Sequence, residues 1–282
     1  MTELFCYPRD ISYYPLPKTE SGSKYVRSAG NITVTYISPY KLPFGKWGDI
    51  SAMLISTKAK MLLDGDRRIE FDSLYKELQR FGFTTSSGYQ ERAFLNALEA
   101  WTTVMVTVEN IEKKSRHITN IPISTEAEIY YGENKRDGRL LLPNKSFIRL
   151  SDSGFHFFTD KAIPVKAKDI TLLPSVMDLR IYIWLVRKLY SIKLEPTLVP
   201  WDLLYLQFGP VRRQHKPRFR RHFVNTLNYI QNYLYPDSKF FSHDEKGIVL
   251  IPSDPHIKPK PGEGILVPSF EAWQKSLTKE AL

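Results

Sequence analysis

The sequence contains a single cysteine, Cys6, among 282 residues. One cysteine cannot form a disulfide within the chain, and it cannot supply the several thiolates of a structural zinc site. The N-terminal residues lack the basic segment and the apolar segment of a signal peptide, and no apolar run is long enough to span a membrane. The sequence therefore predicts a cytoplasmic protein without membrane contact.

Motifs that carry catalysis or bind cofactors are also missing. The six histidines include no His-x-His pair, which a metal-dependent nicking enzyme would need. Gly45 and Lys46 lack the first glycine and the Ser or Thr of a phosphate-binding P-loop. We therefore expect no catalytic residue, no metal and no cofactor. A polar hairpin accounts better than a metal-dependent nuclease site for one acidic group, which consists of Glu126, Glu128, Glu133 and Asp137.

What the chain does have is positive charge and a sufficient core. Lys and Arg number 40 against 30 Asp and Glu, which gives a formal net charge of +10 and a pI near 9.4. Hydrophobic residues make up 42% of the chain, so a folded core is expected rather than disorder. Basic proteins of this size often bind nucleic acid, although an anionic membrane would also attract them. The total charge alone does not decide the partner.

Hydrophobic periodicity outlines the first half of the chain. Residues 1–30 are rich in Pro, Tyr, Ser and Gly, and predict an irregular arm before a strand at 31–38. Three helical patterns and then two alternating patterns follow, and three helices before a hairpin is the order of a winged helix. The predicted helices cover 42–63, 72–82 and 86–101, and the predicted hairpin strands cover 103–110 and 117–124.

The same order recurs in the second half. Residues 145–159 contain two alternating runs around a Ser-Asp-Ser-Gly turn, and predict two strands. Helical patterns then cover 174–192, 199–209 and 216–236, and a strand at 246–253 could close a second wing. The sequence thus predicts an α+β fold with two tandem winged-helix domains, an irregular N-terminal arm and a C-terminal tail. The predicted divisions are an arm with the first strand at 1–39, a first winged-helix domain at 40–125, a connecting β region at 126–172, a second winged-helix domain at 173–257 and a flexible tail at 258–282.

The predicted helix at 216–236 has two contrasting faces. Its apolar residues recur every three or four positions and predict a buried face, made of Phe219, Phe223, Leu227, Ile230 and Leu234. The opposite face carries Arg218, Arg221, Asn225, Asn228 and Asn232. Arg can bind guanine and Asn can bind adenine through paired hydrogen bonds in the major groove. No acid occurs between Asp202 and Asp237. Duplex DNA is therefore the favoured partner, and a solvated basic helix or an acidic protein partner is the alternative.

Candidate DNA contacts are assigned from this pattern. Residues just before the helix are expected to hold phosphates, and those at its start are expected to reach the bases. The full set in this unit is Arg212, Arg213, Lys216, Arg218, Arg220, Arg221, Asn225 and Asn228.

The third helix of the first predicted winged-helix domain has a different exposed face. It carries Arg92, Asn96 and the acidic Glu99, with Leu95 beside them. An exposed leucine suggests protein contact, so we expect dimerisation, auxiliary DNA contact by Arg92, or both. At the hairpin tip, Lys113 and Lys114 are candidate contacts to a DNA backbone, with a solvated loop as an equal alternative.

Three segments together resemble one known family. They are 42–57 with its Leu-Pro-aromatic-Gly element, 151–190 with its aromatic and Pro-Val segments before a helix, and 199–209 followed by the basic helix and "GIVLIPSDPHI". As an ordered set covering about 40–257, they resemble the plasmid replication initiators of the RepA type, whose C-terminal region is built on winged helices. One departure is Trp47-Gly48-Asp49, where the family often has Pro-Arg.

The resemblance implies a bacterial, non-enzymatic initiator. Such a protein would bind repeated sites (iterons) in the double-stranded DNA of a plasmid origin, help to melt adjacent DNA, and recruit a host helicase or helicase loader. It also implies that the first unit serves a homodimer. A winged-helix transcriptional regulator is the alternative, mildly disfavoured because no sensor domain is evident. An endonuclease or strand-transfer enzyme is a third hypothesis.

Overall fold

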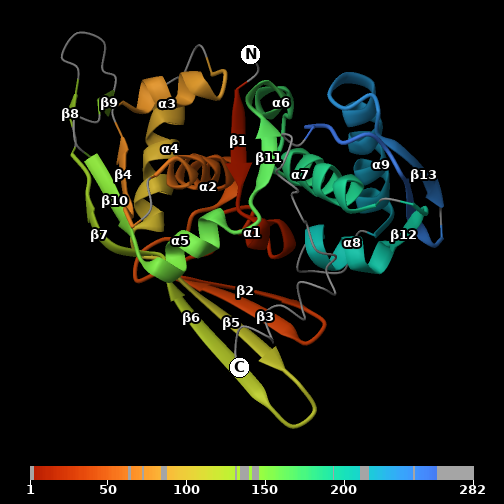
Figure 1. Ribbon diagram of the computed structural model, residues 1–282, viewed down its shortest axis with the longest axis horizontal. Coiled ribbons are helices and arrows are strands. Elements are labelled where there is room, and N and C mark those ends of the chain that lie inside the picture. The colour runs from red at the N-terminus through yellow and green to blue at the C-terminus, as the bar shows by residue number, and fades with distance from the viewer. Residues whose placement is uncertain are drawn as a thin grey trace. The chain divides into compact units, whose positions relative to one another are not determined.

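A computed structural model describes most of the chain (Figure 1). The described residues are 3–62, 65–71, 73–83, 88–130, 132–133, 140–141, 146–192, 194–209, 216–243 and 245–258. Helices and small antiparallel sheets are mixed along the chain, which confirms the α+β class. The chain divides into two compact units, Met1–Leu179 and Arg180–Leu282, called the first and second units below. Except for Lys258, the predicted tail at 258–282 lies outside the described residues.

The first unit contains a winged-helix arrangement. Its strands form an antiparallel sheet in the order β4-β10-β7, so that the last strand in the chain lies in the middle. In chain order the elements are α2 (Gly45–Lys60), β4 (Arg68–Phe71), α3 (Leu74–Arg80), α4 (Gly88–Trp101), β7 (Ser124–Glu128) and β10 (Ser146–Leu150). The short strands β8 (Gly132–Glu133) and β9 (Leu140–Leu141) pair between β7 and β10.

The predicted hairpin exists, but it is not the wing. Its strands, β5 (Met105–Ile111) and β6 (Arg116–Pro122), join β2 (Lys24–Ala29) and β3 (Ile32–Ile37) in a sheet of order β2-β3-β5-β6. Figure 1 shows these four strands extending together away from α2 and α4. Alternating apolar residues correctly indicated the hairpin. Its strand β5, however, pairs with β3, which precedes α2, α3 and α4 in the chain. The wing strand β10 instead lies in the segment predicted to connect the domains.

The prediction of an irregular N-terminal arm is wrong. Strand β1 (Leu4–Tyr7) pairs with β11 (Ile163–Lys166), and the short helix α1 (Arg9–Tyr13) follows it. Phe5 is fully buried, and the Tyr7 hydroxyl donates a hydrogen bond to Asp49 Oδ1 at 2.7 Å. The arm therefore belongs to the core of the first unit. Its pairing partner is about 160 positions away in sequence, beyond the range of any local pattern.

Of the two strands predicted at 145–159, the prediction of the second is also wrong. Residues 152–159 form the helix α5 (Asp152–Thr159), because Ser151 caps its N-terminus by accepting a hydrogen bond from Gly154 N at 2.8 Å. The helix buries Phe157 and Phe158 on one side. A further short helix, α6 (Ala167–Leu172), follows β11.

Helix α5 approaches the chain at Ile123 closely enough to require glycine. A methyl group added at Gly154 would overlap the Ile123 carbonyl oxygen and lie 2.9 Å from its carbonyl carbon. We expect Gly154→Ala to lower the free energy of unfolding by about 1–3 kcal/mol in urea denaturation. Gly88→Ala is the matched control, since nothing lies within 4 Å of the added methyl group. It is expected to be neutral or slightly stabilising, and equal losses in the two variants would contradict the close approach.

The second unit repeats the arrangement of the first. Its sheet has the order β12-β14-β13, again with the last strand in the middle. In chain order the elements are α7 (Val176–Ser191), β12 (Thr197–Pro200), α8 (Trp201–Phe208), α9 (Lys216–Tyr233), β13 (Lys239–His243) and β14 (Gly247–Ile251). The predicted capping box of α7 is confirmed, because Asp178 N donates to Ser175 Oγ at 3.2 Å and Ser175 N donates to Asp178 Oδ2 at 3.1 Å. The two units divide after Leu179, within this helix.

An aromatic cluster fixes α9 in the second unit. The Phe223 ring lies 5.4 Å from that of Trp184, 5.7 Å from that of Phe208 and 6.1 Å from that of Trp201. The predicted buried face of α9 is confirmed, with Phe223, Leu227 and Ile230 fully buried. Burial of this face leaves the opposite side of the helix for solvent.

Candidate nucleic-acid interface

The outer face of α9 is exposed as predicted. All five polar side chains of the stripe reach solvent, and these are Arg218, Arg221, Asn225, Asn228 and Asn232. They follow one side of the helix, since the apolar residues between them are buried. An exposed helix side of this kind can enter the major groove, which admits one α-helix.

Arg218 and Arg221 provide unneutralised positive charge at the start of α9. They lie one turn apart, and no carboxylate in the described part of the chain forms an ion pair with either. The N-terminal end of a helix also carries partial positive charge. These two groups and the helix end therefore present a concentrated site for an anion such as a DNA phosphate, or for the hydrogen-bond acceptors of a guanine edge.

The remaining basic residues of this segment differ from the expectation. Lys216 does have a partner, because its Nζ lies 2.8 Å from Asp202 Oδ1 on α8. The absence of acids between 202 and 237 did not reveal this pair, which forms because α8 and α9 fold side by side. Arg220 is half-buried, with its guanidinium 5.6 Å from the centre of the Trp201 ring. Arg212 and Arg213 lie outside the described residues, so their DNA contacts stay predictions.

The first unit presents its candidate residues in other surroundings. Arg92 and Asn96 are exposed on α4, but Leu95 is 5% exposed, so the expectation of an exposed leucine is wrong. Leu95 is buried because the apolar face of α4 is wider than the projected stripe. Lys113 and Lys114 are exposed in the turn between β5 and β6. Their contact with a DNA backbone stays a prediction.

The acidic group noted in the sequence makes local contacts. Arg149 Nε lies 3.0 Å from Glu126 Oε2, and the Tyr130 hydroxyl donates to Glu128 Oε1 at 2.5 Å. The side chains of Glu133 and Asp137 lie outside the described part. Within the described ranges, no three His, Cys, Asp or Glu residues gather as a metal site would require. Among the described helices, none has the length and apolar character to span a membrane.

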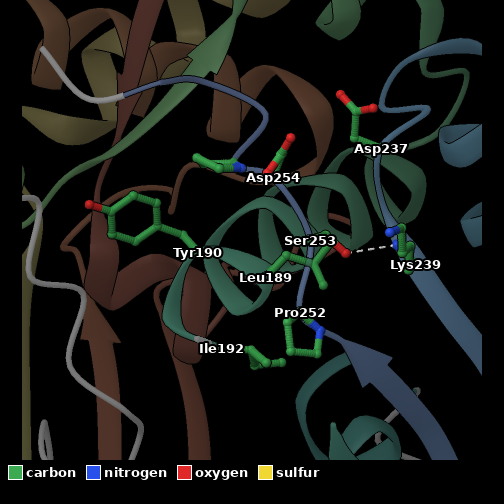
Figure 2. Close-up of a pocket in the computed structure, with 9 residues that line it drawn as sticks. Leu189, Tyr190, Ile192, Asp237, Lys239, Pro252, Ser253 and Asp254 are labelled. Atoms are coloured by element: carbon green, nitrogen blue, oxygen red, sulfur yellow. Dashed lines mark hydrogen bonds between the residues drawn. The ribbon is translucent and has the colours of Figure 1, made fainter. Parts of the chain in front are cut away.

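A cavity of about 380 Å³ lies near the end of α7 in the second unit (Figure 2). Leu189, Ile192 and Pro252 line it, with the carboxylates of Asp237 and Asp254 also at its wall. The segment after β14 is held there because the Tyr235 hydroxyl donates a hydrogen bond to the Asp254 carbonyl. Burial raises the pKa of Tyr235 to about 12. The cavity adjoins the C-terminal end of α9, so it lies away from Arg218 and Arg221.

The fold and this face define the class: an α+β protein with two winged-helix arrangements, of which the second exposes a basic third helix. Comparison with solved structures finds a crystal structure of selenomethionine derivatives of domains 2 and 3 of RctB, with a TM-score of 0.56 and 9% identity, covering 86% of this chain and 96% of that chain. A second crystal structure of RctB domains 2–3 has a TM-score of 0.47 and 12% identity, covering 85% and 94%. No family model matches the chain, and no curated protein matches it in sequence. The first likeness shows a shared fold over most of both chains.

Proposed function

We propose that this chain is a replication initiator that binds double-stranded DNA sequence-specifically and catalyses no reaction. The observation that carries the proposal is the exposed face of α9, where Arg218 and Arg221 precede three asparagines. Arg and Asn are the side chains best suited to guanine and adenine edges in the major groove. An acid-free helix surface on a chain of net charge +10 favours a polyanionic partner.

The finer proposal is initiation at a plasmid origin in the bacterial cytoplasm through repeated sites. It rests on the resemblance to the RepA-type initiators over about 40–257. The shared fold with domains 2 and 3 of RctB, a replication initiator, supports the coarser statement. Recruitment of a host helicase or helicase loader belongs to the same proposal.

Each group on and before α9 has a proposed role. Arg221, Asn225 and Asn228 read bases, since they follow one side of the helix from its first turns. Arg218 contacts either a base or a phosphate at the helix start. Lys216 exchanges Asp202 for a phosphate, and Arg212 and Arg213 hold the DNA backbone.

A homodimer through the first unit is part of the proposal, and the sheet β2-β3-β5-β6 supports it. Its edge strand β6 is largely exposed along seven residues and carries one formal charge, that of Arg116. The opposite edge, β2, carries Lys24 and Arg27, which discourage pairing with another chain. The less protected edge is β6, which favours strand pairing between two copies.

The decisive experiment compares duplexes from the replicon's own non-coding DNA with scrambled duplexes by fluorescence anisotropy at two salt concentrations. A repeated site should bind at least about 1,000-fold more tightly than scrambled DNA. Binding to both should weaken steeply with salt, because phosphate contacts release counterions. Equal affinity for repeated and scrambled duplexes would reject sequence-specific initiation and leave a general polyanion-binding protein.

A further inference from the structure

Two cavities adjoin each other along the outer side of α4 in the first unit. Their volumes are about 230 and 540 Å³, and Lys41 and Asn96 line both of them. The two cavities, which share these residues, are together called the α4 groove. Residues of α4 and of the segment from Tyr40 to Phe44 line it, and Ala127 and Ile129 also line the larger cavity. The α4 groove lies wholly within the first unit.

The shape of this groove distinguishes α4 from α9. Helix α4 holds the third-helix position of its unit, as α9 does in the second unit. A recognition helix must protrude, because the major groove of about 12 Å admits one helix and little else. The exposed side of α4 instead lies beside the segment 40–44, and both line a depression. A duplex is therefore a poor fit, and a narrow ligand is a good one.

The length of the groove indicates a polymer rather than a small molecule. Its lining residues on α4 run from Tyr89 to Ala100, which corresponds to about 17 Å at the helical rise of about 1.5 Å per residue. An extended peptide of about five residues spans that length. Two successive cavities then correspond to two side chains of one segment.

The chemistry of the smaller cavity selects the side chains of that segment. Its inner surface combines the half-buried Trp47 ring with Ala93 and Ala97, whose small side chains leave room for a large apolar group. At its edge Arg92 is exposed and makes no ion pair or hydrogen bond with the described residues. The other cation, Lys41, lies 3.0 Å from Glu20 Oε1 and is already balanced. One positive charge beside an apolar pocket complements a carboxylate next to a large apolar side chain.

We propose that the α4 groove binds an extended segment of a partner protein that carries a large apolar anchor residue beside an aspartate or glutamate. The anchor occupies the cavity formed by Trp47, Ala93 and Ala97, and the carboxylate pairs with Arg92. Arg92 thereby serves protein recognition rather than duplex contact. The two units thus have different partners: α9 binds DNA, and the α4 groove binds a protein.

The test begins with random peptides displayed on phage and selected on the full chain. Counter-selection uses Asn96→Trp, which places an indole between the two cavities. Enriched peptides should share a large apolar residue next to Asp or Glu. A synthetic consensus peptide is then titrated calorimetrically, and fluorotryptophan-labelled protein reports whether the Trp47 resonance moves while that of the buried Trp101 does not.

Matched variants separate the groove from general effects. Asn96→Trp should weaken peptide binding more than about tenfold, whereas Gln79→Trp, an exposed amide on α3, should change it less than about twofold. Replacing the peptide's acidic residue by its amide should weaken binding to the wild type but not to Arg92→Ala, as a direct charge pair requires. Arg92→Ala should leave duplex affinity unchanged.

Three results would overturn the proposal. Peptides could bind Asn96→Trp and the wild type equally, which would place their site elsewhere. A single-stranded oligonucleotide could shift the Trp47 resonance when no peptide does, which would make the groove a nucleic-acid site. The resonance could instead move with protein concentration alone, which would assign the groove to a second copy of the chain. Failure of duplex binding by α9 would leave all three readouts intact.

Discussion

Replacing Phe223 with alanine is expected to lower the free energy of unfolding of the second unit by about 3–5 kcal/mol. Phe223 is fully buried. Its ring lies against that of Trp184 on α7 and against those of Trp201 and Phe208 on α8. Truncation would remove a large apolar side chain and leave a cavity that the surrounding aromatic rings cannot close. Because these contacts fix α9, the outer stripe would lose its position together with the core.

Urea denaturation, followed through the fluorescence of Trp184 and Trp201, measures this effect. Phe223→Leu fills most of the volume and should cost less than half as much. His222→Ala alters an exposed neighbour on the same helix and should change stability by less than about 1 kcal/mol. A loss below about 1 kcal/mol for Phe223→Ala would show that the aromatic cluster does not hold α9.

The helices were predictable because their signals are local. Apolar residues at three- and four-residue spacing located α4, α7 and α9 within a few positions, and Ser175 with Asp178 marked the start of α7 correctly. The repeated helix order also led to the repeated architecture. The exposed stripe of α9 followed from the same periodicity, so the central part of the candidate site could be found without a structure.

Long-range pairing was not predictable in the same way. Strand β1 pairs with β11, and β4 pairs with β10, so each strand finds its partner far away in the sequence. The hairpin β5-β6 looked like a wing because it follows α4 directly, but the partner of β5 is β3, which precedes all three helices. Sequence spacing cannot distinguish an inserted hairpin from a wing hairpin, since both have alternating residues and a polar turn.

The details of the site depend equally on tertiary contacts. The Lys216–Asp202 pair and the packing of Arg220 over Trp201 both require α8 to lie against α9. The α4 groove requires the segment at 40–44 to lie beside a helix about 50 positions later in the chain. Two units with the same strand order thus present unlike third helices: α9 is basic and exposed, whereas α4 lines a groove. Shared architecture does not imply shared function for the two units.

The second large effect is expected at Arg221. Arg221→Ala should weaken binding to a cognate repeat by about 1–3 kcal/mol and relax the choice of base at one position. Arg221 is exposed near the start of α9, is not engaged by a described carboxylate, and can donate two parallel hydrogen bonds to guanine. Anisotropy titrations against the repeat and against each single-base variant of it measure both effects.

Arg213→Ala is the comparison that gives this result its meaning. A phosphate contact carries no sequence information, so this variant should weaken all duplexes alike and reduce the salt dependence by about one counterion. Arg221→Ala should instead lower affinity for the repeat far more than for scrambled DNA, because only the repeat supplies the guanine. If both variants lowered affinity for repeat and scrambled DNA equally, Arg221 would be another phosphate contact. The assignment of α9 as the recognition helix would then be wrong.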